Sequence, residues 1–590
     1  MSIEKKKLIE ALAVGMAAVM TSTMVCGCGQ AVENLPNSEN NAETNILTDG
    51  NISKDDSLAS LTGKKKSEDE KVAVIPEDYE YTLDEDGYFY IGDMPEGPED
   101  NYRNYYEIFV LSFYDSDGDG VGDINGVTQK LDYIQKLGFN GIWLMPIMSS
   151  PSYHKYDTDD YYLVDPSYGT NEDFQNLLEA AHDRGINVVI DFVVNHSSSE
   201  HPWFIQACDY LRSLSTDEEP DVSECPYIDY YHFSREWSSG YCKVEGTDWY
   251  YEGVFNYTQP DLNFDCEALR SEIADIACFW TNMGVDGFRV DAAAHFEEGK
   301  TEYNKQVLAE IYETCVAIKP DFYMVSEVWL DEVTIANYYA SGTPSFFNFD
   351  SADSSGKIVT TAKGNTTAEK FVNSMLKYQN DYAASNPDYI DAVFITNHDM
   401  TRVANQLTND ADAMKMACGL MMSMQGSSFV YYGEEIGMKS SGGSDENKRI
   451  AMYWSEDERE GITNGPENAD KNIRSDFAAA DEQALNPDSI MNYYRRAILM
   501  RNANPEIARG TMSVADELTC DNIAVIIKEY QGEKVVVIYN TGAESADVDL
   551  VGTEYADMAI AGELTIHPWE SAEISGGIVS MPARSIIVLR

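Results

Sequence analysis

The sequence has few basic residues for its length. Its 590 residues contain 41 lysines and arginines against 101 aspartates and glutamates, which gives a formal net charge of −60 at pH 7. A chain this acidic repels nucleic acids and anionic membrane surfaces, so we expect neither to be its binding partner. The charge suits a soluble surface that works on a neutral substrate.

Zinc-binding motifs and long apolar runs are missing as well. The 10 cysteines include no Cys-x-x-Cys pair, which argues against a zinc site. Spacing alone does not give disulfide pairs, although Cys225 and Cys242 are candidates within one loop region. The apolar run over residues 11–20 is too short to span a membrane.

That run belongs to an N-terminal targeting segment. Three lysines, Lys5 to Lys7, precede it, and Val25-Cys26-Gly27-Cys28 follows it. The tetrapeptide resembles a bacterial lipobox, in which Cys28 would be the lipidated first residue of the mature chain and Cys26 the less favoured choice. This predicts an extracellular, cell-surface lipoprotein held in the outer leaflet of the cell membrane. A plain cleaved signal peptide is the alternative.

From residue 105 on, short apolar runs alternate with amphipathic helical patterns. Eight strands are expected, at residues 108–113, 141–145, 188–194, 288–291, 323–326, 346–349, 392–396 and 429–432. Eight strands separated by helices favour an α/β fold, a (β/α)8 TIM barrel, over an open sheet. The long segment rich in Tyr, Trp and Ser after the third strand predicts an inserted subdomain. The rhythm of short strands and tight turns after residue 505 predicts a C-terminal all-β sandwich.

These patterns divide the chain into six segments. We expect a lipoprotein signal peptide and lipidation site at 1–28, a disordered linker at 29–78, the first part of the catalytic barrel at 79–196, the inserted B domain at 197–260, the second part of the barrel at 261–505 and the C-terminal β domain at 506–590.

Polar clusters follow four of the expected strands, at residues 191–196, 289–291, 326–329 and 397–399. Because the carboxyl ends of barrel strands converge at one face, Asp291, Glu327 and Asp399 should meet there. Arg289 lies two residues before Asp291 and should keep that carboxylate ionised, as a nucleophile or charge stabiliser needs. The alternative for each acid alone is a structural ion pair or strand cap.

These clusters resemble the conserved regions of the α-amylase family of glycoside hydrolases. Three further segments extend the resemblance: Tyr156-Asp157-Thr158-Asp159-Asp160-Tyr161, Gln259-Pro260-Asp261-Leu262-Asn263 and Tyr432-Gly433-Glu434-Glu435-Ile436-Gly437-Met438. The last two resemble the branch that holds oligo-1,6-glucosidases, neopullulanases and intermediate α-amylases. The resemblance covers about residues 102–590.

The resemblance implies a role for each matched residue. Asp291 would be the nucleophile, Glu327 the general acid and base, and Asp399 the carboxylate that stabilises the transition state. Retaining hydrolysis needs its two carboxyls about 5–5.5 Å apart with one of them protonated, and an apolar neighbour such as Trp329 is expected to raise the pKa of Glu327. The implied substrate-binding residues are Tyr156, Asp157, His196, Arg289, His295, His398 and Arg402.

A second motif is Asp115-Ser116-Asp117-Gly118-Asp119-Gly120-Val121-Gly122-Asp123. Acidic residues at alternate positions, with glycines that permit a sharp bend, can wrap oxygens around a hard cation. Gly126 stands where a sensor loop of this type has glutamate, so we expect a structural loop. The resemblance implies Ca²⁺ as the cofactor, and an Asp/Gly turn without metal is the alternative. The implied ligands are Asp115, Asp117, Asp119, the carbonyl of Val121, and Asp123.

Two residues bear on specificity. In the family, a valine usually follows the nucleophile of α-1,6-specific glucosidases, whereas small residues such as Ala292 accompany α-1,4 cleavage. Asp157 points the other way, because it resembles a carboxylate that caps the non-reducing end in exo-acting glucosidases. We expect a monomeric α-amylase that cleaves α-1,4 bonds of starch and maltodextrins. The alternatives are an exo-acting α-glucosidase or oligo-1,6-glucosidase, a transglycosylase, and a non-catalytic glucan-binding lipoprotein.

Overall fold

The computed structural model describes residues 74–590 except residue 474. The expected signal peptide, the lipidation site at Cys28 and nearly all of the expected linker lie outside the described residues. None of the helices between residues 74 and 590 has the length and hydropathy of a membrane span.

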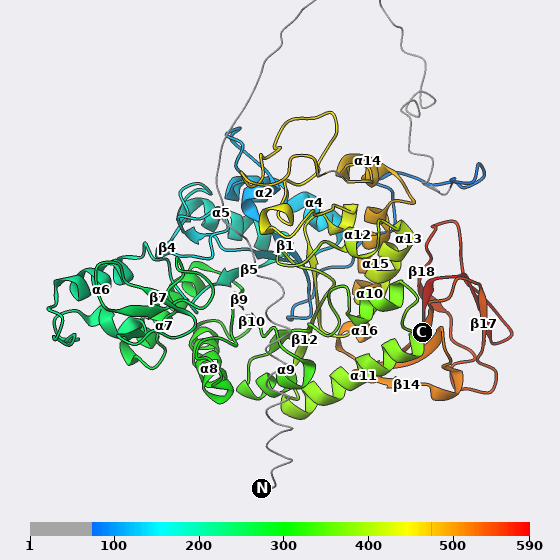
Figure 1. Ribbon diagram of the computed structural model, residues 1–590. Coiled ribbons are helices and arrows are strands. Elements are labelled where there is room, and N and C mark those ends of the chain that lie inside the picture. The colour runs from blue at the N-terminus through cyan, green and yellow to red at the C-terminus, as the bar shows by residue number, and fades with distance from the viewer. Residues whose placement is uncertain (1–73, 474) are drawn as a thin grey trace, which may run out of the picture. The chain divides into compact units, whose positions relative to one another are not determined.

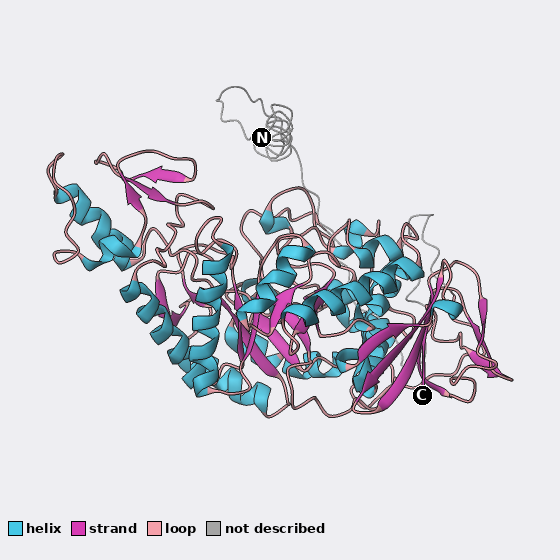
Figure 2. Cartoon of the chain, turned by 90° about the horizontal axis from the view of Figure 1, so that it is seen from below, coloured by secondary structure: helices cyan, strands magenta, loops and turns pink. Residues whose placement is uncertain are grey.

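Eight parallel strands close into a barrel at the centre of the molecule (Figures 1 and 2). Their order around the barrel is β1-β13-β12-β11-β10-β9-β5-β2. The expected (β/α)8 TIM barrel is therefore confirmed. The strands are β1 (Asn104–Ile108), β2 (Gly141–Leu144), β5 (Asn187–Phe192), β9 (Gly287–Val290), β10 (Tyr323–Ser326), β11 (Ser345–Phe347), β12 (Ile390–Phe394) and β13 (Ser427–Tyr431).

The sequence pattern predicts the first strand at residues 108–113, which is too late in the chain. It ends at Ile108, and the apolar residues Val110–Phe113 form a single helical turn instead. Val110 and Phe113 are fully buried in that turn. A short, wholly buried apolar run carries no periodicity, so a strand and a helix cannot be told apart from it.

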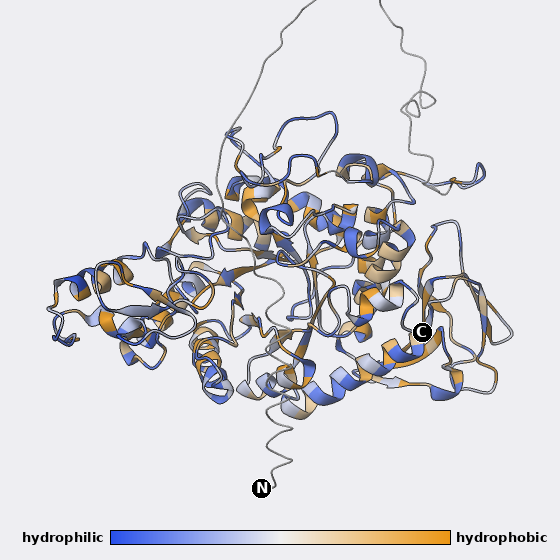
Figure 3. Cartoon of the chain, in the orientation of Figure 1, coloured by the Kyte–Doolittle hydropathy of each residue, from blue (hydrophilic) through white to orange (hydrophobic). Residues whose placement is uncertain are grey.

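Most helices pack around the barrel, and amphipathic ones such as α5, α7 and α11 bury one face. In α5, a capping box between Thr170 and Asp173 starts the helix, and Phe174, Leu177 and Leu178 lie on its buried side. Figure 3 shows the corresponding alternation of hydrophilic and hydrophobic colours along helices such as α11. The helices are α2 (Val110–Phe113), α3 (Ile124–Gln129), α4 (Leu131–Leu137), α5 (Asn171–His182), α6 (Pro202–Ser213), α7 (Glu267–Met283), α8 (Thr301–Ile318), α9 (Glu332–Tyr338), α10 (Lys357–Ala362), α11 (Ala368–Ser385), α12 (Val403–Gln406), α13 (Ala411–Met422), α14 (Ala480–Leu485), α15 (Ile490–Ala503) and α16 (Pro505–Arg509).

The segment inserted after β5 contains α6 and a small antiparallel sheet of β6 (Phe233–Ser234), β8 (Tyr250–Glu252) and β7 (Tyr241–Lys243). Its two ends pair with each other: the Ser197 N–H donates to the Pro260 carbonyl (3.1 Å) and the Leu262 N–H to the Asn195 carbonyl (2.9 Å). The Gln259–Asn263 motif thus closes the insertion against the end of β5.

The two candidate cysteines of this region are not joined. Cys225 and Cys242 both carry free thiols, as do the other cysteines between residues 74 and 590. The suggestion of a disulfide between them is therefore wrong for this structure. Cys225 packs instead in the apolar interior of the insertion, which needs no covalent link.

The C-terminal domain is an antiparallel sandwich, as expected. A five-stranded sheet, β14-β15-β16-β21-β18, faces a three-stranded sheet, β17-β20-β19. At its central hairpin, Gln531 and Gly532 both have positive φ (52° and 87°), which matches the right-handed twist of a two-residue hairpin. The strands are β14 (Thr511–Val514), β15 (Ile523–Tyr530), β16 (Glu533–Asn540), β17 (Ala546–Asp549), β18 (Ile560–Leu564), β19 (Glu573–Ser575), β20 (Ile578–Met581) and β21 (Ser585–Leu589).

Candidate active site

One guanidinium connects the acids at the mouth of the barrel. Arg289, at the end of β9, is only 1% exposed. Its Nη1 donates to Asp191 (2.7 Å) and to Asp291 (2.6 Å), and its Nη2 lies 2.8 Å from Glu327. Because Asp291 and Glu327 contact the two terminal nitrogens of one planar group, they lie next to each other. This juxtaposition is compatible with the separation of about 5–5.5 Å that retaining hydrolysis needs.

Paired strand ends hold the two acids in place. β9 and β10 are hydrogen-bonded neighbours, and Asp291 and Glu327 each follow one of them directly. The chain turns sharply at Ala292, whose φ of 47° lies in the left-handed region that alanine rarely adopts. That turn aims the Ala292 N–H at Glu327 Oε2 (3.1 Å). Backbone strain of this kind is typical of sites where side-chain position matters.

Of the three predicted catalytic acids, Glu327 is the one whose pKa is raised. Burial raises its pKa, and Asp291 and Asp399 add to the shift, while Arg289 opposes it. Trp329, the neighbour expected to cause this shift, is 49% exposed and stacks on Phe349 (4.8 Å between ring centroids). Burial in the barrel mouth, rather than that indole, therefore accounts for the shift.

Asp399 lies between the guanidinium of Arg449 and the imidazole of His398. Its Oδ1 is 2.6 Å from Arg449 Nη2 and its Oδ2 is 3.1 Å from His398 Nε2. Burial favours the neutral acid, but His398 and Arg449 outweigh it and lower the pKa of Asp399. Asp399 is therefore an ionised carboxylate, able to accept hydrogen bonds from sugar hydroxyls.

Tyr156 links this pair to the acids around Arg289. Its ring lies against His398 (5.4 Å between centroids), and its hydroxyl is 2.6 Å from His398 Nε2 and 3.0 Å from Asp191. The Arg289 guanidinium lies 5.9 Å from the centre of the same ring. His196 joins the cluster through its Nε2, 3.1 Å from the Tyr156 carbonyl. Burial lowers the pKa of His196, which keeps that imidazole neutral.

Three predicted binding residues lie further out. Asp157 accepts hydrogen bonds from Ser150 (2.8 Å) and Ser152. His295 is partly exposed and lies 2.5 Å from Glu298. Arg402 is buried and donates to the backbone carbonyls of Tyr432 (2.6 Å) and Lys448 (2.9 Å).

Arg449, and not Arg402, contacts Asp399. Two site residues were not predicted from the sequence. Phe255 has its ring between His196 (5.5 Å) and His295 (5.3 Å). Glu107 lies 2.6 Å from His398. A lone charged residue inside an otherwise uncharged strand was the only signal for Glu107 in the sequence.

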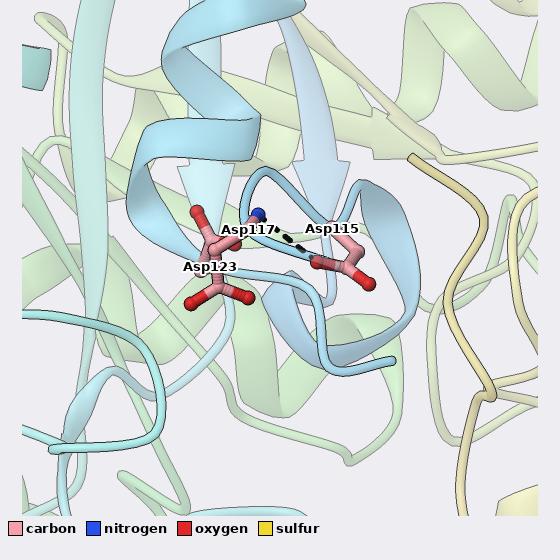
Figure 4. Close-up of side chains that lie close together, drawn as sticks. All are labelled: Asp115, Asp117 and Asp123. Atoms are coloured by element: carbon pink, nitrogen blue, oxygen red, sulfur yellow. Dashed lines mark hydrogen bonds between the residues drawn. The ribbon is translucent and has the colours of Figure 1, made fainter. Parts of the chain in front are cut away.

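The loop after α2 gathers carboxylates in the manner of a cation site (Figure 4). Oxygens of Asp115, Asp117 and Asp123 lie within 4.8 Å of one another. Asp119 is exposed and outside this cluster, with its Oδ1 accepting from the Val121 N–H (2.7 Å). A set of oxygen donors only, on a tightly turned loop, fits a hard cation such as Ca²⁺. Asp123 also caps α3 by accepting from the Gly126 N–H (2.7 Å).

Known proteins share this architecture. Residues 107–510 match the family model described as "Alpha amylase, catalytic domain". The chain is 38% identical over 451 residues to Alpha-amylase 3 of Dictyoglomus thermophilum, covering 74% of this chain and 85% of that protein. Among solved structures, Eubacterium rectale Amy13B superposes with a TM-score of 0.81 at 43% identity, covering 84% of this chain and 96% of that one. The α-amylase from H. orenii gives a TM-score of 0.72 at 33% identity, covering 83% and 99%. The chain therefore belongs to the α-amylase family of glycoside hydrolases, with a catalytic domain of the α-amylase type.

Proposed function

We propose that this protein is a retaining endo-acting α-amylase that cleaves α-1,4-glucosidic bonds of starch and maltooligosaccharides. The observation that carries the proposal is the shared contact of Asp291 and Glu327 with Arg289. It provides two adjacent carboxyls in different environments, which is what a double-displacement mechanism needs.

In the first step, Asp291 attacks the anomeric carbon while Glu327 gives its proton to the leaving glycosidic oxygen. The C–O bond to the leaving sugar breaks, and a covalent glycosyl-enzyme forms on Asp291. In the second step, the Glu327 carboxylate takes a proton from water, whose oxygen attacks the same carbon and releases Asp291. Each residue ends in the protonation state in which it began.

The surrounding residues bind the reacting sugar. Asp399, fixed by His398 and Arg449, accepts hydrogen bonds from hydroxyls of the distorted ring and stabilises positive charge at the anomeric carbon. The Tyr156 ring forms the floor beneath that sugar, since aromatic faces suit the C–H faces of pyranoses. The imidazoles of His196 and His398 contact hydroxyls on either side.

Bond specificity is the finer part of the proposal. Ala292 supports α-1,4 cleavage, because it presents only a methyl group beside both acids. Asp157 supports the second candidate, an exo-acting α-glucosidase or oligo-1,6-glucosidase. A transglycosylase would use the same covalent intermediate with a sugar as acceptor.

Parallel digestion of amylose, maltotriose and isomaltose separates these activities. Endo attack on α-1,4 bonds gives early products of intermediate length from amylose and little cleavage of isomaltose. Glucose as the sole early product, or ready cleavage of isomaltose, would establish the second candidate instead. Products longer than the maltotriose supplied would establish transglycosylation.

Calcium and membrane attachment complete the proposal. Asp115, Asp117 and Asp123 would hold Ca²⁺, with Asp119 and the Val121 carbonyl completing the shell, and the ion would stabilise the loop without entering the reaction.

We further propose that Cys28 is lipidated and holds a monomeric enzyme on the outer face of the cell membrane. Metabolic labelling with radioactive palmitate tests this: Cys28→Ala should abolish incorporation, and Cys26→Ala should not. Equal labelling of the two variants would refute the site.

A further inference from the structure

Hydrogen-bond acceptors lie close to both ring nitrogens of His398. The residue is fully buried. On one side, Nδ1 lies 2.6 Å from the Glu107 carboxylate, which also receives the His398 backbone N–H (3.4 Å). A carboxylate at that distance needs a proton on Nδ1.

The other nitrogen faces Tyr156 and Asp399. The single hydroxyl proton of Tyr156 can be donated to Asp191, whose Oδ2 is 3.0 Å away. Burial raises the pKa of Asp191 to about 7, so above that pH the carboxylate is ionised and accepts this proton. The Tyr156 oxygen (2.6 Å) and Asp399 Oδ2 (3.1 Å) then both require a proton on Nε2.

We propose that Glu107 is a positioning residue that keeps His398 doubly protonated, so that a buried imidazolium orients Asp399 toward the sugar. Glu107 lies on β1, which only β13 separates from β12, the strand before His398, and Glu107 touches none of the three acids in the contacts described above. It acts through His398, in the same way that a buried carboxylate fixes the tautomer of a catalytic imidazole.

The charges around His398 support this assignment. Burial disfavours the imidazolium, but Asp399 and Glu107 together outweigh burial and raise the pKa of His398 to about 9. Arg449 approaches only the carbonyl of His398, where its Nε donates at 3.3 Å. Trp143 packs its ring against the imidazole at 5.7 Å and carries no charge. The negative groups therefore face the ring directly, and the cations do not.

The proposal rests on the proposed function for its catalytic meaning but not for its test. The test is a titration of the His398 ring by ¹⁵N NMR in the full chain without substrate, with the resonance assigned by its loss in His398→Gln. At pH 8 the wild-type ring should carry both protons. In Glu107→Gln, which keeps the shape but removes the charge, the midpoint should fall by about one pH unit or more, since one unit corresponds to a tenfold change in proton affinity.

A matched control is Glu435→Gln. Glu435 is also fully buried, in the 3-10 turn Glu434–Ile436 after β13, and accepts from Tyr106 (2.7 Å) and Tyr133 (2.6 Å), but it does not contact His398. The control should leave the His398 midpoint unchanged. With maltooligosaccharides, Glu107→Gln should lose about tenfold or more in kcat/KM at pH 8, through loss of the charge-assisted hydrogen bond from His398 that orients Asp399.

Two results would overturn the proposal. The first is a neutral His398 in the wild-type protein at pH 8, a measurement that needs no variant and so stands even if Glu107→Gln does not fold. The second is an equal midpoint in the wild type and in folded Glu107→Gln. Failure of the wild type to cleave α-1,4 bonds would refute the proposed function alone and leave this titration unaffected.

Discussion

Arg289 carries a permanent charge into a site where neighbouring acids need different protonation states. Its guanidinium contacts Asp191, Asp291 and Glu327. Burying an arginine without partners would be very costly, so the three carboxylates and the cation stabilise one another. The same contacts fix where each oxygen lies, which a reaction at a single carbon atom requires.

Replacing the carboxyl group of Asp291 or of Glu327 by an amide should abolish turnover and leave the fold intact. For Glu327→Gln we expect a loss of roughly 10²–10⁴ in kcat, the usual contribution of a positioned general acid. For Asp291→Asn we expect a larger loss, because no covalent intermediate can form. Release of reducing ends from amylose measures both.

The matched control is Glu302→Gln, an exposed carboxylate on α8 that pairs with Lys305 (2.8 Å). Its activity should equal that of the wild type, and circular dichroism should show native structure in all three variants. Substantial hydrolysis by both Asp291→Asn and Glu327→Gln would contradict the assignment of roles.

The alkaline limb of the pH–rate profile should report Glu327. Its pKa is raised from the ordinary value of 4.5, mainly by burial, and the proposed mechanism needs its protonated form. Activity should therefore persist above pH 4.5 and fall as the pH rises through the raised pKa. The measurement is kcat/KM for maltooligosaccharides between pH 4 and 9 (about one point per half unit). A decline that begins at or below pH 4.5 would be incompatible with Glu327 as the acid.

At the scale of single elements, the ends of strands and the loops after them determine the chemistry. The turn at Ala292 is the sharpest case, because its left-handed φ of 47° directs a backbone N–H to Glu327. A β-branched side chain is strained in that conformation, whereas glycine adopts it freely.

Ala292→Val should therefore be destabilised by at least about 1 kcal/mol, and it should lose α-1,4 activity as the turn shifts away from Glu327. Ala292→Gly serves as the control, since it should be no less stable than the wild type. Thermal unfolding and amylose digestion measure the two effects. Equal stability of the valine and glycine variants would show that the turn is not strained.

The loop of residues 115–123 makes a separate prediction about metal. A bound ion at about 100 times its Kd stabilises the fold by about 2.7 kcal/mol, so chelation with EDTA should lower the melting temperature by a few degrees. Asp117→Asn should remove this sensitivity, because it loses a ligand but keeps Asp123 as the helix cap. An unchanged melting temperature, with no metal in the purified protein, would argue against the site.

At the scale of the whole molecule, charges are buried where the C-terminal domain meets the barrel. Lys528 on β15 is fully buried, and its Nζ has no hydrogen-bond partner among the described residues. It lines a cavity of about 10 Å³ together with Asp391 of β12. Burial lowers the pKa of Lys528 to about 7 and raises that of Asp391 to about 7.

Lys528→Met should therefore stabilise the protein, by roughly 1–4 kcal/mol at pH 6, where Asp391 is mostly neutral. Between pH 7 and 10.5 the unfolded chain binds more protons at Lys528 than the folded protein does. The free energy of unfolding of the wild type therefore increases as the pH rises through that window. The variant should lack that gain. Thermal unfolding at pH 6 and at pH 9 measures both effects.

The control for this substitution is Lys534→Met, whose side chain is 41% exposed. It should change stability by no more than about 0.5 kcal/mol. A lower melting temperature for Lys528→Met at pH 6 would show that the buried amine has a stabilising partner.

Much of this molecule follows from local sequence. Alternating strands and amphipathic helices predict the barrel, and turn chemistry such as Gln531-Gly532 predicts the C-terminal hairpins. Polar residues directly after strands identify Asp291, Glu327 and Asp399, because a parallel barrel brings strand ends together. The acidic spacing of the loop after α2 predicts its cluster, although only three of its four carboxylates converge.

Sequence alone determined which residues stand at the mouth of the barrel, since their positions follow from periodicity along the chain. Only the tertiary structure decided which charges meet. Glu107 and His398 are 291 positions apart and touch because closure of the barrel aims both side chains into its interior. Arg449 contacts Asp399, and Lys528 of the C-terminal domain lines the same small cavity as Asp391 of the barrel. Such pairings depend on the directions of side chains in three dimensions, and no pattern of neighbouring residues encodes them.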